Sequence, residues 1–142
     1  MTDLMAPSTP PSTVPSTAAA VRAAILPADP FSRNCPSRVV LDHVTSKWGV
    51  LVIVALADGS QRWGELRRGI EGISEKMLAQ TLRTLEADGL VVRTVQATIP
   101  PRVDYELSAL GHGLAERLLP LVEWAGANAA AIVGAPLTPP AP

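Results

Sequence analysis

Three side chains in the stretch GISEKMLAQTLRTLEADGLVVR (residues 72–93) have types suited to nucleic-acid contacts: Lys76, Gln80 and Arg83. At about 100° per residue they fall within roughly 60° of one another on a helix, opposite a stripe of leucines. Arginine can bond a guanine edge through two contacts, glutamine can do so with adenine, and lysine or arginine can bind phosphate. Every surface helix needs a polar face, however, so this pattern alone fits either a solvated face or a recognition helix.

The flanking residues favour the recognition helix. A short helix and tight turn, ELRRGIEGI, precede it, and Ser74 is placed to cap it and to leave backbone N–H groups for a phosphate. Two β-rich runs follow, Leu90–Val95 and Val103–Leu107, around Pro100-Pro101. A helix-turn-helix with a β-hairpin wing is a rarer coincidence than a polar helix face.

Arginines outside this helix complete the expected interface. Arg93 lies on the first strand of the hairpin, and Arg102 lies at its tip after the two prolines, which pre-set the loop. Arg62, at the start of the preceding short helix, is expected to help Ser74 position the DNA backbone. An ordinary exposed hairpin is the alternative for the two wing arginines.

Charge and composition set limits on other functions. The net charge of −1 gives no global case for nucleic acid, but residues 60–103 hold seven basic and five acidic side chains, against five and eight elsewhere. The sequence has no phosphate loop, nucleophile motif or carboxylate pair, so we expect no catalysis and no cofactor. The two histidines and one cysteine are not at metal-ligand spacing, so we expect no metal. We find no membrane span or secretory signal and expect a cytoplasmic protein.

Cys35 is the one thiol in the chain. It stands directly before Pro36 at a predicted helix start, with Arg33 and Arg38 near in sequence. A helix N-terminus and nearby cations both favour the reactive thiolate, which makes Cys35 a candidate redox sensor. Without a second cysteine, a disulfide can form only to another subunit or to a small thiol. A small, partly buried residue without chemistry is the other interpretation.

The remaining pattern predicts a mainly α fold with one small β-hairpin. SRVVLDHV repeats apolar positions at helical spacing after Pro36. KWGVLVIVALADG suits a buried strand by its β-branched content, but its length and setting favour a buried helix. Ser60 is the expected cap of the short helix RWGELRRGI, and a long helix follows Ser108, with Leu110, Leu114, Leu118, Leu121 and Trp124 on its apolar face and a kink near Pro120.

The two ends differ from this dense middle. Residues 1–30 are rich in proline, serine, threonine and alanine, and residues 135–142 are similar. Such segments bury too little apolar area to offset their ordering entropy. We therefore predict disordered tails at 1–30 and 135–142 around a single domain at 31–134.

Three stretches resemble the HxlR-type transcriptional regulators: CPSRVVLDHVTSKWGVLVIVAL, RWGELRRGIEGISEKMLAQTLRTLEADGLVVR and PPRVDYELSALGHGL. Together they cover about residues 33–126. In that family a cysteine-proline pair precedes a helix, and a lysine-tryptophan pair begins the next. Ser46 departs from a common glycine, and SALG from the usual threonine-containing turn; neither lies on the predicted recognition face.

The resemblance implies a winged-helix homodimer related to the MarR group that binds a palindromic operator of double-stranded DNA. It implies a dimer formed by the first and last helices. It also implies that Cys35 matches a position that senses disulfide or electrophile stress in some members, so that an oxidant or a small molecule is the effector. A winged helix can instead be a protein-interaction module without DNA binding, which the negative net charge keeps open.

Overall fold

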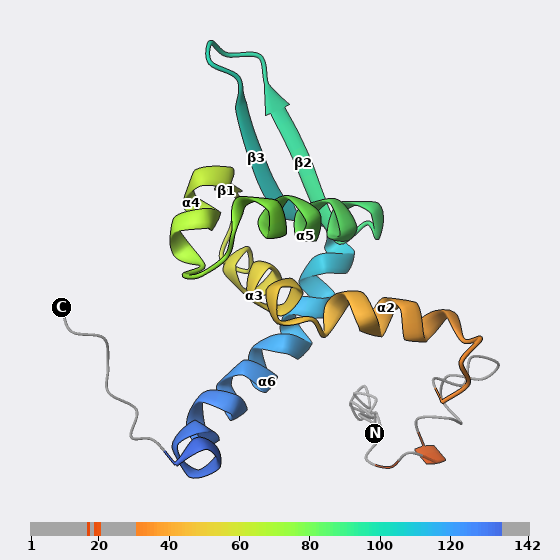
Figure 1. Ribbon diagram of the computed structural model, residues 1–142. Coiled ribbons are helices and arrows are strands. Elements are labelled where there is room, and N and C mark those ends of the chain that lie inside the picture. Colours follow the sequence, from red (N-terminus) through yellow and green to blue (C-terminus); the bar gives the residue numbers. More distant parts are fainter. Residues whose placement is uncertain (1–16, 18, 21–30, 135–142) are drawn as a thin grey trace, which may run out of the picture. The chain divides into compact units, whose positions relative to one another are not determined.

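The computed structural model describes residues 17, 19–20 and 31–134 (Figure 1). The predicted tails at 1–30 and 135–142 lie almost wholly outside these residues, so the predicted domain limits stay predictions. The chain divides into two units, Met1–Val40 and Leu41–Pro142. The described segment from residue 31 leads into helix α2 (Pro36–Val44), which begins in the first unit at the predicted proline and ends in the second.

Helix α3 (Lys47–Ala55) confirms the helical prediction for the apolar KWGVLVIVA run. Ser46 begins it as N-cap, because its side chain accepts a hydrogen bond of 3.1 Å from the Gly49 N–H. Val52 and Ile53 have no exposed surface. This helix is therefore the buried centre of the second unit, and helices α4, α5 and α6 pack against it.

Helix α4 (Trp63–Gly69) begins later than predicted, and the Ser60 cap is wrong. Gln61 and Arg62 instead form strand β1 (Gln61–Arg62). Glu65 caps the start of the helix, because its carboxylate accepts a hydrogen bond of 3.0 Å from the Arg62 backbone N–H. Pairing of β1 with a distant strand thus takes precedence over the local cap.

Helix α5 (Glu75–Ala87) follows the predicted turn. Ser74 caps it, accepting from the Met77 N–H at 3.0 Å. The chain reverses after Asp88 at Gly89, whose φ of 76° lies in the left-handed region that glycine adopts without steric cost. The inner face of α5 is a stripe of three leucines that are at most 1% exposed: Leu78, Leu82 and Leu85.

The sheet has three antiparallel strands in the order β1-β3-β2, so the predicted hairpin is joined by a strand that the sequence pattern missed. Strand β2 (Val91–Gln96) pairs with β3 (Arg102–Leu107) along its whole length, from Val91 opposite Leu107 to Gln96 opposite Arg102. Figure 1 shows this hairpin extending beyond helices α4 and α5, as a wing does. The fold is a winged helix-turn-helix.

Helix α6 (Ala109–Val133) begins at the Ser108 cap and continues through Pro120. Its buried residues are Gly111, Ala115 and Leu118. On the predicted apolar face, Leu110, Leu121 and Trp124 are 64%, 53% and 58% exposed. The helix therefore carries two apolar faces, one against the core and one open in the single chain.

Candidate nucleic-acid interface

The predicted recognition face lies on α5, the second helix of the helix-turn-helix. Lys76, Gln80 and Arg83 are all exposed, and the three buried leucines lie on the opposite side of the helix. The leucines fix the rotation of α5 about its own axis, because turning the helix would bring them into water. The three polar side chains are therefore held together on one outward surface.

Ser74 occupies the N-terminal end of this surface. Its exposed side chain accepts from the Met77 N–H, so the hydroxyl oxygen already has a structural role as cap. The other N–H groups of the first turn of α5 point along the helix axis in the direction that favours anions. If this end of α5 positions a phosphate, the backbone N–H groups of the first turn therefore make the contact together with Ser74.

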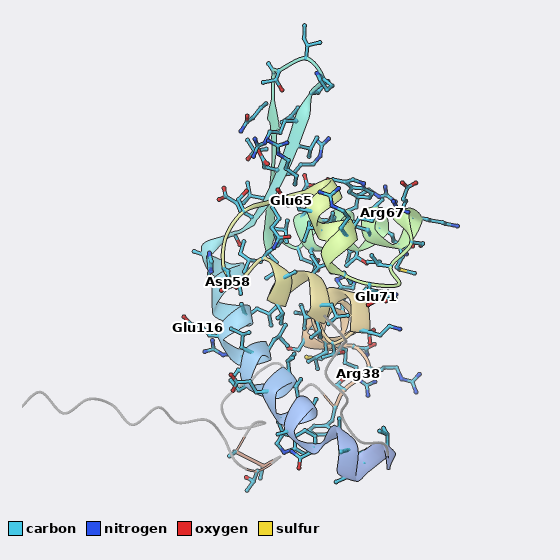
Figure 2. All side chains as sticks on the ribbon, turned by 90° about the vertical axis from the view of Figure 1, so that its left-hand side faces the viewer. Arg38, Asp58, Glu65, Arg67, Glu71 and Glu116 are labelled. Carbon is cyan, nitrogen blue, oxygen red and sulfur yellow. The ribbon has the colours of Figure 1, made fainter. Side chains whose placement is uncertain are left out.

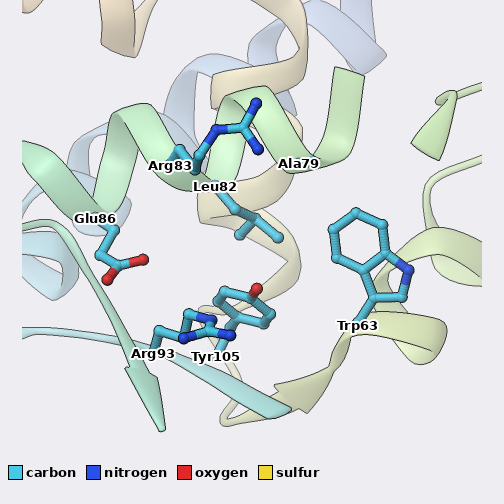
Figure 3. A pocket seen from close by; sticks show the side chains of 7 residues that line it. All are labelled: Trp63, Ala79, Leu82, Arg83, Glu86, Arg93 and Tyr105. Carbon is cyan, nitrogen blue, oxygen red and sulfur yellow. The ribbon is translucent and has the colours of Figure 1, made fainter. Parts of the chain in front are cut away.

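Arg93 lies on the side of the sheet that faces α5. It pairs with Tyr105, and both residues line a hollow of about 350 Å³ with Arg83 (Figure 3). Figure 3 shows Arg83 and Glu86 on the α5 side of this hollow and Arg93 on the β2 side. Arg83 and Arg93 thus share one concave surface, and Glu86 adds a negative charge that the sequence reasoning did not place there.

Trp63 also lines this hollow and is only half-buried. Trp63 also packs against the hydrophobic core. It closes the side of the hollow nearest α4 (Figure 3). No local pattern indicated this position, because the hollow forms only where α4, α5 and the strands β2 and β3 come together.

Arg102 is not at the tip of the wing, and that prediction is wrong. It is the first residue of β3 and pairs with Gln96, so the tip is made by the residues between them. The residues of the tip, 97–101, are all exposed, and the apolar side chain of Ile99 is fully exposed. The Arg102 Nε donates to both carboxylate oxygens of Asp104, at 3.0 and 3.1 Å. Arg102 is therefore held at the wing by an ion pair within its own strand.

Arg62 and Arg102 share the other side of the sheet. Side chains alternate between the two faces along a strand, and directly paired residues share a face. Arg62 pairs with Asp104, which stands two residues from Arg102, whereas Arg93 pairs with Tyr105. Arg62 and Arg102 border a second hollow of about 390 Å³, with Pro100 and Pro101. The arginines that were predicted to contact the DNA backbone thus fall into two groups on opposite faces of the sheet. Figure 2 shows the side chains of the wing extending beyond the helices.

Cys35 lies in the first unit, Met1–Val40, and is a free thiol that is 6% exposed. Its backbone is ordered by two hydrogen bonds, from the Cys35 N–H to the Ser32 carbonyl at 3.1 Å and from the Arg38 N–H to the Cys35 carbonyl at 3.0 Å. The residue precedes the first turn of α2, as predicted.

The described residues contain no group of three or more histidine, cysteine or acidic side chains able to hold a metal ion. None of the described helices is long and apolar enough to cross a membrane. His43 Nδ1 forms a hydrogen bond of 2.7 Å with Asp88 Oδ2 at the end of α5.

Comparison with known proteins identifies the family. The model of the HxlR-like helix-turn-helix family matches residues 43–132. The chain belongs to the HxlR-like helix-turn-helix family. A relative from Escherichia coli K12, the uncharacterized HTH-type transcriptional regulator YtfH, is 50% identical over 98 residues, which are 69% of this chain and 78% of YtfH.

Solved structures of two similar regulators agree with the fold. The putative transcriptional regulator ytfH from Salmonella typhimurium has a TM-score of 0.70 and 46% identity, over 73% of this chain and 93% of that one. The redox regulator HypR in its oxidized form has a TM-score of 0.62 and 38% identity, over 66% and 97%. Helices α4 and α5 are thus the helix-turn-helix of an HxlR-like transcriptional regulator, and β2 and β3 are its wing.

Proposed function

We propose that this protein regulates transcription by binding double-stranded DNA with α5 in the major groove. The observation that carries the proposal is the grouping of Lys76, Gln80 and Arg83 on the exposed side of a helix that three buried leucines hold in place. These three side chains contact base edges or phosphates. Ser74 and Arg62 position the DNA backbone, and Arg93 and Arg102 serve the wing. Such a protein acts in the cytoplasm, where the DNA is.

Homodimerisation is the second part of the proposal. Helix α2 exposes Val39, Val40 and Leu41, and α6 exposes Leu110, Leu121, Trp124, Ile132 and Val133. Apolar side chains gathered on two helices are typical of an interface, and most soluble oligomers are two-fold symmetric dimers. A dimer places two copies of α5 on one duplex, so the operator is palindromic, with half-sites about 34–36 Å apart.

A salt-titrated gel shift tests DNA binding. DNA recovered by genomic pull-down serves as probe, and a shuffled duplex of the same composition is the control. We expect the logarithm of the affinity to fall linearly with the logarithm of the salt concentration, because bound phosphates release counterions. A protein-interaction module would show neither preference for the recovered sequence nor a steep salt dependence.

We further propose that Cys35 makes the regulator responsive to oxidants or electrophiles. Support comes from its place before α2 and from the structural likeness to HypR, which is a redox regulator. Oxidation of two Cys35 thiolates forms one S–S bond between subunits and passes two electrons to the oxidant. Because Cys35 is 6% exposed, its reaction requires local opening of the residues around it.

Treatment with diamide followed by a non-reducing gel tests the redox proposal. We expect a dimer band that Cys35→Ser abolishes and a change in DNA affinity in the wild type alone. If no band forms and DNA affinity is unchanged, Cys35 has a structural role only.

A further inference from the structure

Asp104 is an unusual residue for the wing of a DNA-binding protein, because a carboxylate near DNA is repelled by the phosphates. It is the only acidic or basic residue that is buried among the described residues 17, 19–20 and 31–134, with 8% exposure. It lies on β3, the central strand, between Thr94 of β2 and Arg62 of β1. A buried charge is costly unless it is paired, so its partners explain why it is tolerated.

Asp104 accepts hydrogen bonds from two side chains. Arg102 Nε lies 3.0 Å from Oδ1 and 3.1 Å from Oδ2, and Gln96 Nε2 lies 3.1 Å from Oδ2. Gln96 and Arg102 are paired across β2 and β3, two residues along the strands from the pair Thr94 and Asp104 and on the same face of the sheet. The carboxylate is therefore fixed from two strands.

The ion pair leaves much of the Arg102 head group available. A guanidinium has five N–H groups, and the bond to Asp104 uses the one on Nε. The side chain of Arg102 is 39% exposed, whereas that of Asp104 is 11% exposed. The negative charge is thus covered while the four N–H groups of the terminal nitrogens keep the geometry that suits a phosphate.

We propose that Asp104 is a positioning residue for DNA: it holds Arg102 so that Arg102 and Arg62 together contact the DNA backbone beside the second hollow. This inference rests on the proposed DNA-binding function. Free arginine side chains lose much rotamer freedom when they bind, and an arginine already held by its Nε loses less. Arg62 pairs with Asp104 across β1 and β3, so the two cations flank one buried anion on one face of the sheet.

A double-mutant cycle tests the proposal, with full-length wild type, Asp104→Ala, Arg102→Ala and the double variant. Binding is measured on the duplex recovered by genomic pull-down and on its shuffled control over a range of salt. Asp104→Ala should weaken binding about three- to tenfold in the wild-type background, a typical coupling for neighbouring residues, and less than about twofold in the Arg102→Ala background. Because the contact is to the backbone, both duplexes should lose affinity alike.

Two further variants separate positioning from charge and from folding. Glu106→Ala removes the same charge from an exposed site on the same face of β3, so it should leave affinity unchanged or raise it. Asp104→Asn keeps the volume and one acceptor oxygen, so it should bind better than Asp104→Ala. It is also the variant to use if circular dichroism shows that Asp104→Ala is unfolded.

Three results would overturn the positioning role. An equal loss from Asp104→Ala with and without Arg102 would make Asp104 a structural residue. A gain in affinity from Asp104→Ala would show that the Asp104 carboxylate hinders the contact of Arg102 with DNA. Normal binding by Arg102→Ala, while Arg83→Ala binds poorly, would refute the positioning role and leave DNA binding intact. If the wild type itself shows no salt-dependent binding, the failure belongs to the proposed function instead.

Discussion

Replacing Arg83 by alanine should weaken operator binding without weakening the fold. Arg83 is exposed on α5, and its neighbour Leu82, which is 1% exposed, carries the packing. Exposed substitutions away from special features change the free energy of unfolding by less than about 0.5 kcal/mol. An arginine contact to a base is worth about 1–3 kcal/mol, and a symmetric dimer makes it twice. The expected loss is therefore about 2–6 kcal/mol, at least roughly thirtyfold in Kd.

The salt dependence tells which kind of contact Arg83 makes. If it binds a phosphate, the slope of log affinity against log salt becomes shallower by about 0.9 per subunit, or about 1.8 per dimer. If it reads a base, the slope changes little and the preference for the operator over a shuffled duplex falls. Fluorescence anisotropy on both duplexes at several salt concentrations measures the affinity and the slope together.

Arg117→Ala is a matched control for Arg83→Ala. It removes the same charge from an exposed site on α6, where Nη1 donates only to the Gly113 carbonyl of its own helix at 2.7 Å. Sedimentation of both variants checks that each assembles as the wild type does. Equal affinity of Arg83→Ala and wild type, or equal losses in the two arginine variants, would refute the placement of Arg83 at the DNA.

Other substitutions test the fold and the assembly. A Cβ at Gly111 would collide with the Leu90 backbone carbonyl, so Gly111→Ala should lower the free energy of unfolding by about 1–3 kcal/mol in urea titrations. A Cβ at Gly113 meets open space, so Gly113→Ala should raise the free energy of unfolding by about 0.5–1 kcal/mol. A change of the same sign in both variants would contradict this packing. Ser74→Ala should cost about 1 kcal/mol through loss of the α5 cap, and an unchanged urea midpoint would show that the cap contributes nothing. Leu121→Glu should convert the dimer to monomer in analytical ultracentrifugation, because Leu121 is 53% exposed in the single chain; a dimer that persists would place the interface elsewhere.

The helices were predictable because their information is local. The leucine spacing, the Ser74 cap and Gly89 define α5 within a few residues of sequence. Strand β1 was not predictable, since two residues carry no periodicity and their partners, Asp104 and Tyr105, lie more than 40 positions away. The prediction that Ser60 caps α4 was wrong for the same reason, because the pairing of β1 with β3 moves the start of the helix to Trp63.

The candidate site was predictable on α5 and less so on the wing. The sequence placed Arg93 and Arg102 on one wing, but only the strand register shows that they lie on opposite faces. The link between Arg102 and Asp104 did leave a signal, because residues two apart on a strand share a face. The hollow beside Trp63 left none, since it needs α4, α5 and the sheet to come together.

The central claim is that α5 reads DNA sequence. The most direct measurement is the ratio of affinities of the wild type for the duplex recovered by genomic pull-down and for its shuffled control, across a salt titration. We predict a ratio of about 10³ or more and an affinity that falls steeply with salt for both duplexes. Equal affinities for the two duplexes, or an affinity that does not change with salt, would contradict the account.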